Sequence, residues 1–159
     1  MKKTGLFSVR YLCQAAVIAA VYAALTVLLP AISYGEWQCR ISEILTILPV
    51  LMPQAVPGLT IGCLLANLIS PVGVADIVFG TLATLVAACG TRFFRKNIVL
   101  AAACPVVSNG IIVGAMLSWF YGLPLWLTML QVAAGELVSV ILGVLLLKPM
   151  KKVNPELFS

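Results

Sequence analysis

The stretch that decides the fold reads ILTILPVLMPQAVPGLTIGCLLANLI and covers residues 44–69. It is one apolar run without a charged residue, and Pro49, Pro53 and Pro57 interrupt it. Proline removes a backbone donor and clashes with the preceding helical turn. Pro53 and Pro57 therefore predict a turn between two short helices, with Gln54 at its tip. We interpret the run as two short membrane spans rather than one long span.

Four further apolar runs flank this stretch. They cover 11–32, 74–90, 98–121 and 124–147, in a chain of 159 residues that is 62% hydrophobic and 9% charged. A soluble domain carries about 25% charged residues. A hydrocarbon core about 30 Å thick needs about 20 apolar residues per crossing. The composition predicts a single all-α, polytopic membrane domain over residues 1–159, with lipid as its main solvent.

The distribution of basic residues favours six spans over five. Nine of the ten Lys and Arg residues fall in three clusters, at the N-terminus, in the 91–97 loop and at the C-terminus. Six spans place all three clusters on one side, as expected of cytoplasmic segments, whereas five spans separate them. The predicted topology therefore has six transmembrane helices with both termini in the cytoplasm. The predicted spans are 11–32, 42–53, 57–70, 74–91, 98–120 and 124–147.

The residue types present argue against several functions. The chain has no histidine, and its five cysteines form no Cys-x-x-Cys pair, so we expect no metal site. No Gly-x-x-x-x-Gly-Lys-[Ser/Thr] phosphate loop is present, so ATP hydrolysis by this chain is not expected. The basic clusters lack interleaved aromatic residues, which argues against nucleic-acid binding. We expect a protein that is not an enzyme and holds no cofactor.

Polar side chains inside the predicted spans are costly in lipid and mark candidate functional positions. Glu136 lies near the middle of the last span, where an acid costs about 2.5–3.5 kcal/mol on insertion scales. Asn109 is the midpoint of the fifth span. Asn67 lies near the end of the third span and Asp76 near the start of the fourth, and both are predicted to lie near the outer face.

The outer loop 33–41 and the residues after it add further polar and aromatic groups. Trp37, Arg40 and Glu43 would form the mouth of a pocket that opens outward, with the four intramembrane polar residues around and below it. Carboxylates accept hydrogen bonds from amines and ring N–H groups, and amides supply both a donor and an acceptor. This inventory suits a small, planar, nitrogen-rich ligand.

Each position also has a structural interpretation. Asp76 complements the dipole at a helix N-terminus, and the two asparagines are explained equally well by hydrogen bonds between helices. Arg40 and Glu43 can pair on the surface, and Trp37 can anchor the chain at the interface. Glu136 is harder to explain in this way, because no intramembrane Lys or Arg is available to neutralise it.

The first span carries two adjacent stripes of small residues. One is Ala15, Ala19 and Ala23, and the parallel one is Ala16, Ala20 and Ala24. Small residues at four-residue spacing let helix backbones approach closely in lipid. The two stripes form a broad, flat face that suits either a partner protein or neighbouring spans.

Several blocks of sequence resemble the QueT-type substrate-binding (S) subunits of energy-coupling factor (ECF) transporters, which take up queuosine precursors. The blocks read QCRISE (38–43), PGL with GCLLAN (57–67) and DIVFG with LAT (76–84), and Asn109 and Gly135-Glu136 also fit. Each block alone is weakly specific, so the resemblance depends on their order and spacing.

The resemblance implies six helices, a pocket on the outer side and no ATPase in this chain. It also implies docking on an ECF transmembrane coupling protein that carries two cytoplasmic ATPases, in the plasma membrane of a prokaryote. In such transporters docking uses small residues of the first helix, which Ala15, Ala19 and Ala23, or the parallel stripe, match.

The ligands implied by the resemblance are 7-deazaguanines, namely queuine, preQ1 or preQ0. The aminomethyl group of preQ1 would be cationic and would suit a second acid. Trp37 would stack on the ligand, and the three acids would accept its donors. The three remaining residues, Arg40, Asn67 and Asn109, would donate to the ligand or hold the acids.

Two other classes of function stay open. A small secondary transporter or channel that works alone predicts transport in liposomes without ATPases. A structural membrane subunit without a ligand predicts no ligand-dependent stabilisation, and it leaves Glu136 unexplained.

Overall fold

The computed structural model describes residues 8–28 and 40–153, and all regular structure within these ranges is helical. The all-α prediction is therefore confirmed for this part of the chain. The elements are α1 (Val9–Leu28), the 3-10 helix η1 (Ile41–Val50), α3 (Ala55–Asn67), the π-helical stretch η2 (Asp76–Gly80), α4 (Thr81–Phe93), α5 (Ile98–Tyr121) and α6 (Leu125–Val153).

Four stretches of the described chain are long and apolar enough to cross a membrane, namely α1, η2 continued by α4, α5 and α6. The predicted second and third spans form the shorter apolar helices η1 and α3, of 10 and 13 residues. With a rise of about 2.0 Å per residue in η1 and 1.5 Å in α3, each is about 20 Å long. Four of the six predicted spans thus coincide with stretches of membrane-crossing length, and the count of six spans and the cytoplasmic position of the termini stay predictions.

The turn predicted between Pro53 and Pro57 lies a few residues earlier, at 51–54, between η1 and α3. Pro49 lies inside η1, and the chain then turns at 51–54 before α3 begins at Ala55, directly after Gln54. Pro57 falls in the first turn of α3, where its missing N–H would have no intrahelical partner in any case. The prolines therefore set the break between the two short helices.

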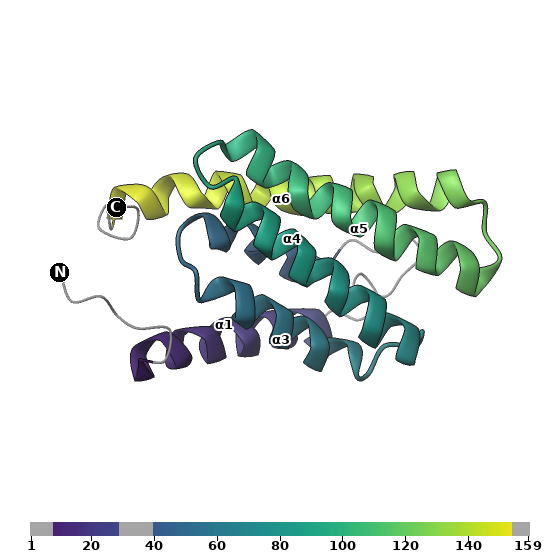
Figure 1. Ribbon diagram of the computed structural model, residues 1–159, viewed down its shortest axis with the longest axis horizontal. Helices are drawn as coiled ribbons and strands as arrows, with labels where there is room; N and C mark the ends of the chain where they lie inside the picture. Colours follow the sequence, from purple (N-terminus) through teal and green to yellow (C-terminus); the bar gives the residue numbers. More distant parts are fainter. Residues whose placement is uncertain (1–7, 29–39, 154–159) are drawn as a thin grey trace.

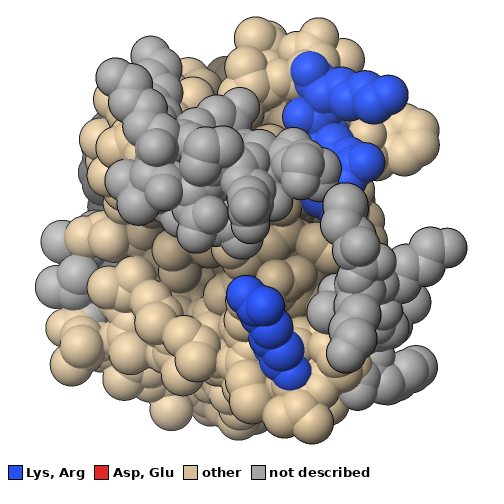
Figure 2. Space-filling view, turned by 90° about the vertical axis from the view of Figure 1, so that its left-hand side faces the viewer, with Lys and Arg blue, Asp and Glu red and all other residues tan. Residues whose placement is uncertain are grey.

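The helices pack side by side in a bundle whose two ends differ in charge. In Figure 1 the start of α1, the α4–α5 turn and the end of α6 lie at one end, and the α5–α6 turn lies at the other. Figure 2 looks onto the first of these ends and shows basic but no acidic side chains among the described residues. Arg10, Arg95 and Lys96 are exposed. This is the charge asymmetry expected of a cytoplasmic end.

Helices α1 and α3 pack closely because two glycines of α3 face α1. A Cβ added to Gly58 would lie 2.8 Å from the backbone oxygen of Ala15, and one added to Gly62 would lie 2.8 Å from that of Ala19. This is the close approach that small residues permit between helices in lipid. Gly58 and Gly62 therefore hold α3 against α1.

This packing bears on the stripe predicted for docking. Ala15 and Ala19 are buried and Ala23 is half-buried, so α3 already occupies much of this face. The parallel stripe is exposed along its whole length, at Ala16, Ala20 and Ala24. The sequence could not rank the two stripes, because both have the same spacing.

Replacement of Gly62 by Leu should destabilise the protein, because the new side chain meets the backbone of α1. We expect the free energy of unfolding to fall by about 1–3 kcal/mol, as for an overpacked core. Thermal unfolding in detergent measures this loss. The control is Ala16→Leu on the exposed stripe of α1, which should change stability by less than about 0.5 kcal/mol. Equal stability of the two variants would contradict this packing.

Candidate functional site

The candidate site centres on the side chain of Arg40, which is only 6% exposed although it is charged. Its Nη2 lies 2.9 Å from Oδ2 of Asp76 in a buried ion pair. Its Nη1 donates a hydrogen bond of 3.2 Å to Oδ1 of Asn67. Arg40 precedes η1, Asn67 ends α3 and Asp76 begins η2. One guanidinium group therefore joins three elements and three of the residues predicted from sequence.

Asn67 completes this group of contacts. Its Nδ2 donates to the backbone oxygen of Asp76 at 2.9 Å and to Sγ of Cys63 at 3.3 Å. Asn67 and Asp76 are both fully buried. The prediction that Asn67 bonds between helices is confirmed, because its amide joins α3 to the start of η2. The surface pairing of Arg40 with Glu43 is wrong, because the guanidinium is buried and pairs with Asp76.

The π-helical stretch η2 makes room for these side chains. A Cβ added to Gly80 would lie 2.7 Å from Nδ2 of Asn67 and 2.8 Å from Oδ1 of Asp76. Only glycine leaves this space open. π-Helical turns occur often at functional sites. Gly80 belongs to the DIVFG block of the sequence. Its position in that block did not reveal that it lies against the side chains of Asn67 and Asp76.

Glu43 lies beside the same group, and its side chain is buried. Its Oε1 accepts a hydrogen bond from the hydroxyl of Tyr22 on α1. The charges of Arg40 and Asp76 are both close enough to act on it. Arg40, Glu43, Asn67 and Asp76, together with Tyr22, form what we term the Arg40 cluster.

The sequence analysis did not predict that residues of α1 form hydrogen bonds to η1. The hydroxyl of Tyr22 reaches Glu43, and Thr26 donates to Oγ of Ser42 at 2.7 Å. Ala15, Ala19, Tyr22 and Thr26 are the buried residues of α1. Their spacing of four, three and four residues is the pattern of one helix face. This pattern would have placed Tyr22 and Thr26 on the face that meets α3 and η1.

Helix α6 borders the Arg40 cluster. Oγ of Ser139 donates to the backbone oxygen of Arg40 at 3.1 Å. Glu136 is buried one helical turn earlier, which corresponds to about 5 Å along the axis. Asn109 is buried on α5, but no hydrogen bond within the described residues joins it to the Arg40 cluster. Trp37 lies outside the described residues.

Two buried carboxylate oxygens of the Arg40 cluster can still accept hydrogen bonds. Oε2 of Glu43 and Oδ1 of Asp76 have no hydrogen-bond partner in the described part of the chain. A buried acceptor left unsatisfied costs about 1–3 kcal/mol, and more when it is charged. The cluster is therefore chemically suited to bind a ligand that supplies N–H donors.

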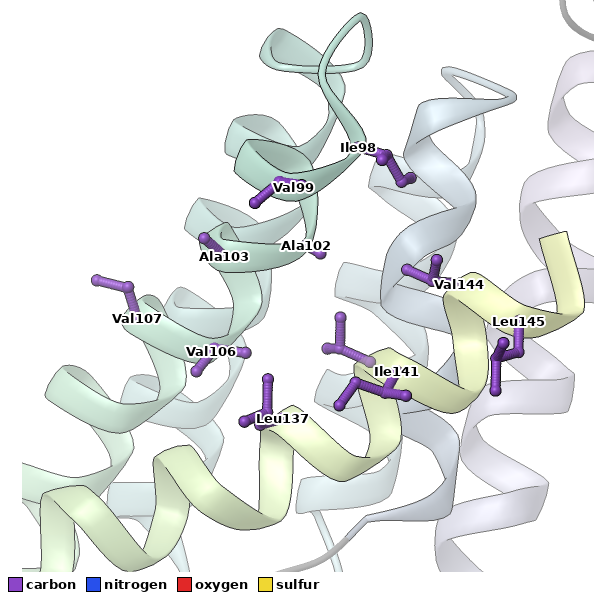
Figure 3. Close-up of a pocket in the computed structure, with 11 residues that line it drawn as sticks. Ile98, Val99, Ala102, Ala103, Val106, Val107, Leu137, Ile141, Val144 and Leu145 are labelled. Atoms are coloured by element: carbon purple, nitrogen blue, oxygen red, sulfur yellow. The ribbon is translucent and has the colours of Figure 1, made fainter. Parts of the chain in front are cut away.

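A separate groove of about 420 Å³ lies between the first half of α5 and the middle of α6. Figure 3 shows its apolar side chains, among them Val106, Leu137 and Ile141. None of the predicted site residues lines it. Its chemistry is that of a lipid-facing surface rather than that of a polar ligand site.

Comparison with known proteins gives the family. The family described as QueT transporter matches residues 12–152. A curated relative from Lactococcus lactis subsp. cremoris, named queuosine precursor transporter QueT, is 38% identical over 88 residues. This match covers 54% of the present chain and 50% of the relative. No solved structure matches the chain.

Removal of the Arg40 side chain should leave Asp76 buried without its cation. We expect Arg40→Met to lower the free energy of unfolding by about 3–5 kcal/mol, as when one partner of a buried ion pair is lost. Addition of Asp76→Asn should recover most of this loss, because no uncompensated charge then remains. Thermal unfolding in detergent measures both.

The control is Arg95→Met in the exposed α4–α5 turn, which should leave stability within about 0.5 kcal/mol of the wild type. A double variant as unstable as Arg40→Met would show that the ion pair is not the reason for the loss.

Proposed function

Because the chain belongs to the QueT transporter family, we propose that it is the substrate-binding membrane subunit of an ECF importer. It captures a 7-deazaguanine (queuine, preQ1 or preQ0) on the outer side of a prokaryotic plasma membrane. Partner ATPases, joined through a transmembrane coupling protein, drive uptake. The printed name of the Lactococcus relative supports a queuosine precursor as the substrate class.

The observation that carries the proposal is the pair of buried carboxylate oxygens on Glu43 and Asp76 that lack partners among the described residues. A guanine-like ring offers N–H and NH₂ donors on one edge, which match two carboxylate acceptors. Ligand binding removes the cost of leaving these acceptors unsatisfied. Glu136 and Asn109 form the floor of the proposed pocket, and Trp37 provides the stacking surface at its mouth.

We place this site on the outer side because it lies away from the basic end of the bundle. The end of α3 and the start of η2 point toward the α5–α6 turn, whereas the exposed basic residues flank the α4–α5 turn (Figure 1). The proposed topology keeps six crossings and both termini in the cytoplasm. The short helices η1 and α3 then cross a bilayer that is locally thinned or hydrated around the site.

Docking on the coupling protein is proposed to use Ala16, Ala20 and Ala24 rather than the stripe of Ala15 and Ala19. The exposed stripe offers a flat surface to a partner helix, whereas α3 covers the other. Without a hydrophobic driving force in lipid, such close packing is a main source of helix association.

The first test is thermal unfolding of the purified chain in detergent with queuine, preQ1, preQ0, guanine or riboflavin. A deazaguanine at 100 times its Kd should add about 2.7 kcal/mol to the free energy of unfolding, and riboflavin should add nothing. Folded protein that no deazaguanine stabilises would reject the binding proposal. Transport in liposomes by this chain without partner subunits would favour a secondary transporter instead.

The docking proposal is tested with Ala20→Trp, which fills the exposed stripe of α1. We expect the variant to bind a deazaguanine as the wild type does but to lose co-purification with the coupling protein. The control is Leu130→Trp on α6, another exposed position, which should assemble normally. Normal assembly of Ala20→Trp would show that this stripe is not the docking surface.

A further inference from the structure

The charged side chains of the Arg40 cluster do not balance. Two acids, Glu43 and Asp76, are at most 3% exposed, and Arg40 is the one basic side chain buried among the described residues. Residues 29–39, which precede Arg40 in sequence, contain no Lys or Arg. The exposed basic residues Arg95 and Lys96 lie in the α4–α5 turn. This turn is at the opposite end of the bundle from the end of α3 and the start of η2 (Figure 1).

The guanidinium group of Arg40 forms its ion pair with Asp76 and not with Glu43. Its Nη2 forms the ion pair with Asp76, and its Nη1 bonds to Asn67. Glu43 receives only the neutral hydroxyl of Tyr22, and its Oε2 has no partner in the described part of the chain. The groups that act electrostatically on Glu43 are Tyr22 of α1, Arg40 and Asp76, and Cys63 of α3 lies beside Tyr22 and Arg40. None of these groups brings a second positive charge.

A buried carboxylate is strongly disfavoured without a counter-charge. The site therefore gains most from a ligand that delivers a cation with hydrogen-bond donors to Oε2 of Glu43. An ammonium group has three donors and no acceptor, so it fits a carboxylate oxygen of this kind. A neutral ligand of the same shape satisfies the hydrogen bond but leaves the charge unbalanced.

We propose that Glu43 is the counter-ion for a protonated amine on the ligand, so that the site selects amine-bearing deazaguanines over neutral ones. This inference rests on the proposed function and adds the property by which the site ranks its ligands. Asp76, whose charge Arg40 neutralises, contributes through Oδ1 as an acceptor for the ring.

The test compares preQ1, which carries an aminomethyl group, with preQ0, which carries a nitrile at the same position. On the wild-type protein we expect preQ1 to bind about 10- to 100-fold more tightly, the range for a hydrogen bond to a charged group. Calorimetry or ligand-dependent unfolding measures both Kd values. Equal affinities for the two ligands would overturn the inference and leave the proposed function intact.

Substitution at Glu43 then locates the counter-ion. Glu43→Gln keeps the shape and should reduce the preference for preQ1 to less than about threefold, chiefly by weakening preQ1, since preQ0 gains nothing from the charge. Glu43→Asp keeps the charge and should retain part of the preference. The control is Arg95→Met in the exposed α4–α5 turn, which removes a charge outside the Arg40 cluster and should retain the preference in full.

A full preference in Glu43→Gln would overturn the assignment of Glu43. Should Glu43→Gln fail to fold, Glu43→Asp and the wild-type comparison still decide the matter. The shorter side chain of Glu43→Asp draws the carboxylate back from the ligand, so a preference as large as in the wild type contradicts the assignment. If neither preQ1 nor preQ0 binds to folded wild-type protein, the proposed function and this inference are both rejected.

Discussion

The ion pair between Arg40 and Asp76 is the contact on which the polar part of the structure depends. The energy of two opposite charges rises steeply in a medium of low dielectric constant, and so does the cost of taking them out of water. The pair is tolerated because Asn67 fixes its geometry, with one hydrogen bond from the guanidinium and another to the backbone of Asp76. In this way the ion pair joins η1, α3 and η2.

Glycine residues allow the helices around this ion pair to pack closely. Gly58 and Gly62 let α3 lie directly against α1, and Gly143 of α6 faces the backbone oxygen of Ile44 in η1. Two short helices can lie inside a bundle of longer ones only if their neighbours approach this closely. Lipid gives no hydrophobic drive for such packing, so shape complementarity and buried polar contacts replace it. The polar cluster and the glycine contacts therefore stabilise the same region.

Burial of charged side chains is costly, and stability alone does not account for it. A membrane protein that needed only stability would gain little from three buried acids and one base, because buried ion pairs are seldom better than apolar packing. On the proposed function, these residues hold a polar ligand out of water, which would explain their presence in a member of the QueT transporter family. The apolar groove between α5 and α6 shows the opposite chemistry, with a lining of aliphatic side chains only.

The sequence by itself determined the helical class, the break at Pro53 and the charge asymmetry, because these follow from local composition and backbone chemistry. It also singled out Arg40, Glu43, Asn67 and Asp76 as candidate site residues. Only the tertiary structure decided that Arg40 pairs with Asp76 rather than with its neighbour Glu43, and that Ala15 and Ala19 face α3. Partner choice depends on which elements meet in space, and residues with equal spacing along one helix give no preference between its two faces.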